Sequence, residues 1–272
     1  MKEWRYIYSG FCHPYANMAI DESLMLNYAN TNKPVLRIYG WQPAGFSIGF
    51  SQNADSVLDI RKCSKLNIPV VRRLTGGTLI FHDKEITYSL ICSQQDLGRP
   101  ATVKESYKRI CKSLFSFYSH FGLKACFSLD EPRSFRSRSG LCFASCQDYD
   151  IMIQGKKIGG NAQRRKKSLI LQHGSIPLEL DTGKIEDFLK EDTSCLYGKT
   201  TSLNGLTSQK NDFSTTAGIL RKSFERNLSA VLAESGLTEP EQKLAVNLEK
   251  NKYSGIEWNN HATFKTKTCM AV

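Results

Sequence analysis

The sequence predicts an α+β protein built on a mixed, largely antiparallel β-sheet that is flanked by helices. Up to about residue 180, short segments alternate between apolar and polar residues as strands do, and most are joined by turns short enough for hairpins. Amphipathic helical patterns lie between these segments and dominate after about residue 200. Because no linker-like stretch divides the chain, we expect one domain over residues 1–272. Its core would span about 1–200, with a helical C-terminal extension over about 201–272 packed on it.

The elements of the first third follow from these patterns in order. Residues 4–9 alternate like an edge strand, and residues 17–26 place apolar side chains at helical spacing. Residues 35–41 and 46–52 predict two further strands, and Asp55 is placed to cap a short helix that ends at about residue 66.

The middle of the chain contains the strongest patterns. Residues 68–74 predict a strand that ends at the glycine turn 75–78, and residues 79–83 and 86–91 predict a hairpin. Thr102 is placed to cap an amphipathic helix that Gly122 ends. A strand over 149–153 is closed by Gln154 and Gly155, and a strand over 169–176 carries His173.

After Pro177 the patterns are mostly helical. We expect a short helix over 182–189, a loop over 200–214, a helix over 216–235 and a last helix over 239–250. Thr238 and Glu241 have the spacing of a capping box at the start of the last helix. The polar tail from Tyr253 is expected to be loosely held.

Composition limits the class of protein. Of the 272 residues, 40% are hydrophobic, which provides a sizeable core, yet no apolar run approaches the roughly 20 residues of a membrane span. The N-terminus has no apolar signal-peptide region, so we expect a soluble, cytoplasmic protein without a membrane partner. The nine cysteines are scattered, which favours reduced thiols over a disulfide framework, and their spacing argues against zinc.

A net charge of +11 calls for an explanation. Nucleic acid is the usual partner of a basic chain, but no zinc finger, RNA-binding motif or basic helix is present. An acidic protein partner fits the charge equally well, so charge alone does not decide.

Two residues near the middle of the chain could carry catalysis, one as a nucleophile and the other as a cation. Cys142 could be a nucleophile, since nearby cations lower the pKa of a thiol and a thiolate attacks thioesters well; a buried, inert cysteine is the common alternative. Lys157 precedes Gly159 and Gly160, which leave room for a substrate carbonyl beside the ammonium. Its alternative is a solvated, lysine-rich hairpin.

The segment over residues 72–78 could bind an anion or an acyl chain. Arg72 and Arg73 supply charge, and Gly76 and Gly77 allow main-chain N–H groups to approach a ligand. A bulge or an ordinary hairpin turn is the alternative. His82 and Asp83 could form an acid/base pair, but neighbours on a strand point to opposite faces, which favours a structural role.

Taken together, these segments resemble the lipoate–protein ligase, octanoyltransferase and biotin ligase superfamily over nearly the whole chain. The motifs that carry the resemblance are Asn17 to Glu22, Trp41 to Gln52, Arg72-Arg73-x-Thr75-Gly76-Gly77 with His82-Asp83, Lys157-Ile158-x-Gly160-x-Ala162-Gln163, and Gln172 to Ile176. The resemblance implies the catalytic-domain fold of these enzymes over the whole chain.

Two chemistries occur in this superfamily. Lipoate ligases use ATP and Mg²⁺ to activate free lipoate, whereas cysteine-type octanoyltransferases take an octanoyl group from acyl carrier protein onto a cysteine. Three features resemble the transferases: Cys142-Phe143 at the place of their acyl-accepting cysteine, where ligases usually have a Gly-Arg-Asn-Asp type segment; the motif at 82–89; and the C-terminal end. Ala144 and Thr78 depart from the transferase pattern, which usually has an acidic residue at the first position and arginine or glycine at the second.

The resemblance therefore implies octanoyl transfer to the lysine of a lipoyl domain, in glycine cleavage H protein or a 2-oxoacid dehydrogenase E2, by a monomer that needs neither metal nor ATP. The implied catalytic residues are Cys142 and Lys157, and the implied substrate-binding residues are Arg72, Arg73, Thr75, Gly76, Gly77, His82, Gly160, Asn161, Ala162 and His173. Three alternatives stay open: an ATP-dependent lipoate ligase, an amidotransferase between lipoyl domains, and a non-catalytic binder of lipoyl domains or nucleic acid.

Overall fold

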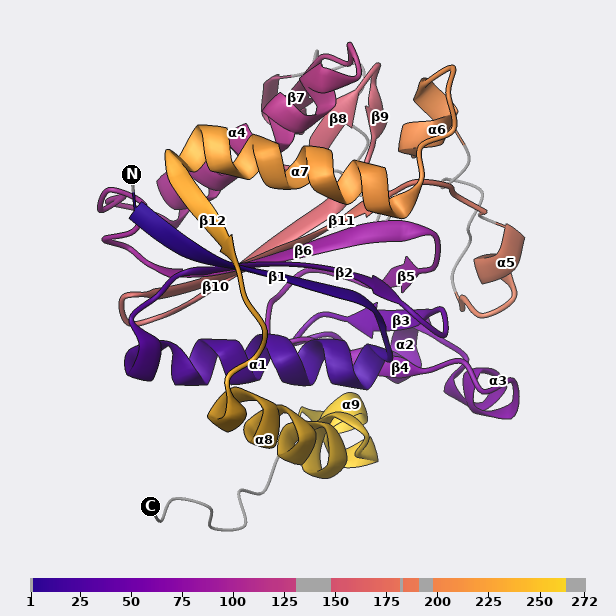
Figure 1. Ribbon diagram of the computed structural model, residues 1–272. Helices are drawn as coiled ribbons and strands as arrows, with labels where there is room; N and C mark the ends of the chain where they lie inside the picture. The colour runs from indigo at the N-terminus through magenta and orange to yellow at the C-terminus, as the bar shows by residue number, and fades with distance from the viewer. Residues whose placement is uncertain (1, 131–147, 182, 191–197, 263–272) are drawn as a thin grey trace.

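A six-stranded mixed sheet forms the centre of the protein in a computed structural model, which describes residues 2–130, 148–181, 183–190 and 198–262 (Figure 1). The strands lie in the order β10-β11-β6-β2-β1-β12. Their bounds are Gly160–Lys166 for β10, Leu169–Pro177 for β11, Glu85–Ser93 for β6, Val35–Trp41 for β2, Lys2–Cys12 for β1 and Ala230–Glu234 for β12. The first three pairings are antiparallel and the last two are parallel, which confirms the predicted fold class.

The alternation of residues 4–9 predicted an edge strand, but β1 lies inside the sheet, between β2 and β12. The edge is β12, which lies inside the range expected to be one helix over 216–235. Helix α7 (Phe213–Leu228) ends instead at Ser229, which adopts a left-handed conformation with φ of 49°. The next residues alternate between buried and exposed, with Ala230 and Leu232 inside, so they suit a strand better than a helical face.

Helices α4 (Val103–His120) and α7 pack together over one face of this sheet (Figure 1). Thr102 caps α4 as predicted, because its hydroxyl accepts a hydrogen bond from the N–H of Glu105 at 3.0 Å. Leu114 and Phe117 of α4 share the main core with Phe224 of α7 and with the buried face of the sheet. The amphipathic patterns of both helices therefore mark the faces that the sheet covers.

Helix α1 (Pro14–Thr31) covers the other face and is itself covered by α8 (Glu239–Leu248) (Figure 1). Ser23 donates to the carbonyl of Glu241 at 2.6 Å, and Arg5 forms a buried ion pair with the same glutamate. Glu241 also accepts from the N–H of Thr238, as the capping-box spacing predicts. Because α1 lies between two layers, it buries polar residues such as Asn17 and Asp21, which its helical pattern did not distinguish.

Two small sheets flank the large one. The first has the order β4-β3-β5, with β3 (Gly45–Ile48) parallel to β4 (Val70–Arg72) and antiparallel to β5 (Ile80–His82). The predicted hairpin of 79–83 with 86–91 is wrong, since β5 pairs with β3 and β6 joins the large sheet. The second sheet has the order β7-β8-β9, with bounds Ala125–Phe127, Ile151–Ile153 and Lys156–Lys157.

The short helices differ in detail from the expected ones. Asp55 does not cap a helix: Asn53 caps α2 (Ala54–Val57) and Asp59 caps α3 (Ile60–Lys65), because the buried Leu58 interrupts the two. The remaining short elements are η1 (Ser128–Asp130), α5 (Gly183–Glu186) and α6 (Leu203–Leu206), the last inside the expected loop.

The segment after α8 is not loosely held as far as it is described. It forms η3 (Glu249–Tyr253) and α9 (Ile256–His261), and the rings of Tyr253 and Trp258 are buried with their centroids 5.9 Å apart. Lys252 reaches Glu22 of α1 at 2.7 Å. Two aromatic side chains and a buried ion pair thus fix a segment whose polar composition suggested mobility. Across the residues that the structure describes, every helix is too short or too polar to cross a membrane.

Candidate active site

A cavity opens where the large sheet meets the β4-β3-β5 sheet. Its space is about 900 Å³, open solvent at its mouth included. Strands β2, β3, β5, β6, β10 and β11, the glycine loop after β4, and the β8–β9 hairpin all contribute side chains. The lining residues are Met18, Tyr39, Trp41, Ser47, Arg73, Gly77, Thr78, Leu79, Ile80, Phe81, His82, Glu85, Thr87, Asp150, Lys157, Gly159, Gly160, Asn161, Ala162, His173, Gly174, Ser175, Pro177 and Leu180.

Most of the site residues expected from the sequence line this cavity. They are Arg73, Gly77, His82, Lys157, Gly160, Asn161, Ala162 and His173. Arg72, Thr75 and Gly76 do not line it. Cys142 lies outside the described residues, as does Cys146, so the structure does not place the expected nucleophile.

Lys157 lies in the cavity wall and not on a solvated surface. Its ammonium Nζ is 2.8 Å from Oδ2 of Asp150, and the two side chains are only about a tenth exposed. The neighbouring Lys156 is exposed. The β8–β9 hairpin therefore turns one lysine outward and the other toward the cavity.

Arg73 supports the glycine loop from within. Its guanidinium donates to the carbonyl of Ser47 at 3.0 Å, to that of Gly76 at 3.1 and 3.2 Å, and to that of Thr78 at 2.7 Å, so the loop is folded around the side chain. The loop lies directly against Gly49, where an added Cβ would come within 1.8 Å of the carbonyl oxygen of Gly77. Sequence reasoning missed Gly49, whose lack of a side chain admits the loop.

Arg72 has a different role from Arg73. Its side chain is buried and donates to six main-chain carbonyls, those of Gly49, Phe50, Gln52, Trp258, Asn259 and Asn260. Burial lowers the pKa of this guanidinium below its usual value. Arg72 thus joins the strand before the glycine loop to the C-terminal helix.

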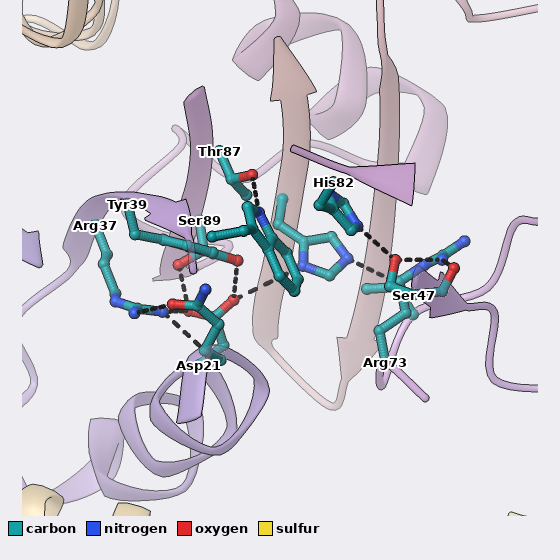
Figure 2. A network of polar contacts seen from close by, with 12 residues as sticks. Asp21, Arg37, Tyr39, Ser47, Arg73, His82, Thr87 and Ser89 are labelled. Atoms are coloured by element: carbon teal, nitrogen blue, oxygen red, sulfur yellow. Dashed lines mark hydrogen bonds and ion pairs between the residues drawn. The ribbon is translucent and has the colours of Figure 1, made fainter. Parts of the chain in front are cut away.

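His82 is held in a buried relay of polar groups (Figure 2). Its Nδ1 is 2.8 Å from Oε1 of Glu85, and its Nε2 is 2.7 Å from the hydroxyl of Ser47. Because a carboxylate only accepts, Nδ1 carries a proton and donates it to Glu85, while the Ser47 hydroxyl is the partner of Nε2. The ring is also stacked on Trp41, with centroids 3.8 Å apart and planes within 10°.

Glu85 anchors this relay. Besides His82, its carboxylate accepts hydrogen bonds from Ser175 at 2.6 Å and from Thr87. Burial alone would raise the pKa of Glu85, but His82, Ser175 and Thr87 together hold it below its usual value. The neighbouring Asp83, which the sequence offered as the partner of His82, instead pairs with Lys184 at the surface.

His173 belongs to a second relay in the cavity wall. Its Nε2 is 2.6 Å from the hydroxyl of Thr75, and its Nδ1 faces Oδ2 of Asp21 at 3.7 Å. Burial lowers the pKa of His173, although Asp21 opposes the effect, so the ring is neutral at pH 7. Thr75, expected to bind substrate, thus contacts a residue of the cavity wall and does not face the cavity itself.

Asp21 is the buried charge around which the second relay is built (Figure 2). Its carboxylate accepts from Arg37 at 2.8 Å, from Tyr39 at 2.9 Å and from Ser89 at 2.7 Å. Burial would raise the pKa of Asp21, but Arg37, His173 and Ser89 hold it below its usual value. The cavity therefore has two fixed histidines, each backed by an ionised carboxylate.

Sequence reasoning did not name Asp150, Glu85, Ser47 or Asp21 as site residues, although the last three lie within motifs that carry the family resemblance. Two further signals were available. The two-residue turn at Gln154 and Gly155 sets the hairpin register that brings Asp150 toward Lys157. Polar residues such as Thr87 and Ser175 inside strands buried on both faces indicate a hydrogen-bond network, since a buried polar group needs a partner.

Three of the described cysteines are buried away from the cavity. Burial raises the pKa of Cys63 to about 11 and that of Cys111 to about 12, and it raises the pKa of Cys92 well above its usual value. Such thiols stay protonated at pH 7 and are poor nucleophiles. Among the described residues there is no cluster of three or more histidines, cysteines or carboxylates that could hold a metal ion.

Comparison with known proteins identifies the class of enzyme that has this fold and this cavity. A lipoate protein ligase from Thermoplasma acidophilum, studied as a bipartite enzyme with its E2 lipoyl domain, superposes with a TM-score of 0.81 at 21% identity, over 98% of this chain and all of that one. This similarity shows that the fold is that of the lipoate protein ligases.

Sequence similarity extends over almost the full length. Residues 13–225 match the family described as the lipoyl protein ligase A/B catalytic domain. Octanoyltransferase LipM of Geobacillus kaustophilus is 36% identical over 94% of this chain and 97% of its own, and LipM of Bacillus subtilis is 35% identical with the same coverage. The chain belongs to the lipoyl protein ligase A/B catalytic domain family and is an enzyme of its octanoyltransferase group.

Proposed function

We propose that this enzyme transfers an octanoyl group from acyl carrier protein to the lysine of a lipoyl domain, through a thioester on Cys142. The observation that carries the proposal is the similarity of nearly the whole chain to the LipM octanoyltransferases. The cavity with Lys157 in its wall supplies a site for the chemistry.

The reaction would proceed in two half-reactions. The Cys142 thiolate attacks the carbonyl of the octanoyl thioester, the new S–C bond forms, and the carrier leaves as a thiolate that takes up a proton. The ε-amine of the acceptor lysine then attacks the enzyme thioester, loses a proton as the amide bond forms, and releases Cys142. Neither half-reaction requires ATP or a metal ion.

Both tetrahedral intermediates carry an oxyanion that the enzyme would have to stabilise. The Lys157 ammonium lies in the cavity wall, and the segment that follows it approaches the cavity through Gly159, Gly160 and Asn161. A fixed cation and main-chain N–H donors in a water-poor site stabilise such an oxyanion. Lys157 would also favour the thiolate form of Cys142.

The cavity wall suits a medium-length acyl chain. Met18, Leu79, Ile80, Phe81 and Leu180 supply apolar surface between the polar relays. Since each buried methylene contributes about 0.8 kcal/mol, a wall of fixed depth selects for chain length. These apolar side chains therefore favour a chain of several methylenes, such as an octanoyl group.

The acceptor would be the lipoyl domain of glycine cleavage H protein or of a 2-oxoacid dehydrogenase E2. The net charge of +11 suits acidic protein partners, because complementary charge accelerates their encounter. We propose that the enzyme works as a monomer that meets donor and acceptor in turn.

An in vitro transfer assay tests the proposal. The enzyme, octanoyl–acyl carrier protein and an unmodified lipoyl domain are combined without ATP, and the intact mass of the lipoyl domain is measured by mass spectrometry. We expect octanoylation by the wild type and by Cys146→Ala, and none by Cys142→Ala. Modification that needs lipoate and Mg²⁺-ATP and survives Cys142→Ala would identify a ligase. Octanoyl transfer only from another octanoylated lipoyl domain would identify an amidotransferase.

A further inference from the structure

Asp150 contacts Lys157 inside the cavity and no motif from the sequence included it. The ion pair is 2.8 Å long, both side chains line the cavity, and both are about nine-tenths buried. An ion pair this enclosed differs from a surface pair, because neither side chain can readily replace its partner with water. Each side chain's position therefore depends on the other.

The register of the β8–β9 hairpin explains why these two residues meet. Met152 lies opposite Lys157, so Asp150, two residues before Met152, lies on the same face and diagonal to the lysine. Gln154 and Gly155 have φ of 52° and 72°, as the two-residue turn of such a hairpin requires.

The main chain is held on both sides of this pair. The N–H of Ser128 donates to the carbonyl of Asp150 at 2.8 Å. The N–H of Lys157 donates to the carbonyl of Lys199, and its carbonyl accepts from the N–H of Thr201, both at 2.9 Å. With the backbone fixed, the remaining freedom of the ammonium lies in the four-carbon side chain, and that is the freedom the Asp150 contact removes.

We propose that Asp150 is a positioning residue for Lys157, an inference that rests on the proposed function. An ammonium has three N–H donors, so the one bound to Asp150 leaves two that can face the cavity. Held in this way, Lys157 presents its charge to the thiolate and the carbonyl oxygen before the substrate arrives. Such preorganisation raises the rate of the chemical step and leaves substrate affinity largely unchanged.

A purely structural ion pair would behave differently. Its loss would change the free energy of unfolding and would affect activity only as far as the hairpin is disturbed. A positioning role requires that the effect of Asp150 on the rate pass through Lys157. A double-mutant cycle separates the two, because residues that act through one another do not have additive effects.

The test measures single-turnover acylation of Cys142 by octanoyl–acyl carrier protein in the full chain, over a range of donor concentrations. The variants are Asp150→Asn, Asp150→Glu, Lys157→Ala and the double variant Asp150→Asn/Lys157→Ala. Asp148→Asn is the matched control, since Asp148 is an exposed carboxylate two residues away. Urea unfolding of each variant reports its stability.

We expect Asp150→Asn to lower the maximal acylation rate by about tenfold to a hundredfold, less than complete removal of an oxyanion donor, with the half-saturating donor concentration nearly unchanged. Asp150→Glu should restore part of the rate, and Asp148→Asn should match the wild type. In the Lys157→Ala background, Asp150→Asn should not lower the acylation rate further.

An Asp150→Asn enzyme as fast as the wild type overturns the inference. So does an equal loss with and without Lys157, or a loss that follows stability alone. A wild type that takes no octanoyl group overturns the proposed function, and this inference with it.

Discussion

The side chains of Arg72 and Trp258 each donate a hydrogen bond to the main-chain carbonyl of the other residue. The guanidinium of Arg72 donates through Nε to the carbonyl of Trp258 at 3.0 Å, and the indole Nε1 of Trp258 donates to the carbonyl of Arg72 at 2.9 Å. Far apart in sequence, the two residues connect β4 to α9. The C-terminal helix therefore supports the strand that leads into the glycine loop of the cavity.

Replacement of Arg72 should destabilise the protein strongly. Arg72→Met keeps the volume but removes a side-chain donor from six main-chain carbonyls, which we expect to lower the free energy of unfolding by about 3 kcal/mol or more. Urea unfolding at pH 7 measures this change, with the exposed Arg61→Met as the control. A change in Arg72→Met no larger than in Arg61→Met would show that the carbonyls find other donors.

Gly49→Ala should disturb the glycine loop, whereas Gly76→Ala should be tolerated in stability. A Cβ at position 49 would lie 1.8 Å from the carbonyl oxygen of Gly77, and a Cβ at position 76 would meet nothing within 4 Å. Displacement of the loop should cost about 1–3 kcal/mol, the usual range for overpacking. The two melting temperatures test this, and equal values would mean that the loop moves aside freely.

His173 should make stability depend on pH just below neutrality. Burial lowers its pKa from the ordinary value of 6.5, so the unfolded chain binds a proton more readily than the folded one. The contribution of this residue is present above pH 6.5 and is lost as pH falls, with a slope of at most about 1.4 kcal/mol per pH unit for one proton. His173→Gln should flatten urea-derived stabilities between pH 7 and 5, with the exposed His120→Gln as the control. An unchanged slope in His173→Gln would contradict the assignment.

Asp21 and Glu85 should dominate the loss of stability in acid. Their partners hold the pKa of each carboxyl below its ordinary value, 3.8 for Asp21 and 4.5 for Glu85. Stability from these groups is therefore present above pH 4.5 and is lost as pH falls through the lower pKa values of the folded state. Asp21→Asn and Glu85→Gln should be less stable at pH 7 and lose less between pH 5 and 3. An acid loss in both variants as large as in the wild type would refute this account.

The sequence predicted strands and helices better than it predicted their neighbours. Val35–Trp41 and Leu169–Pro177 were expected almost to the residue, since continuous β-branched and aromatic patterns define strands locally. The position of β1 inside the sheet was not, because its neighbour β12 comes from the other end of the chain and was hidden in a helical pattern. Tertiary partners of this kind leave no local signal.

The same distinction applies to the site. Lys157, His82 and His173 could be named from their motifs, and the structure places all three at one cavity. The groups that hold them, Asp150, Glu85 and Asp21, were not named as site residues, because a supporting contact depends on register and on layers that meet only in the folded chain. The role of Cys142 stays a prediction, since that residue lies outside the described part of the chain.

The covalent intermediate on Cys142 is the central claim, and the intact mass of the enzyme after incubation with octanoyl–acyl carrier protein, without ATP, tests it most directly. We predict a mass increase of one octanoyl group that hydroxylamine removes and that Cys142→Ala does not acquire. An unmodified wild type that nonetheless lipoylates a lipoyl domain once lipoate and Mg²⁺-ATP are supplied would contradict the claim.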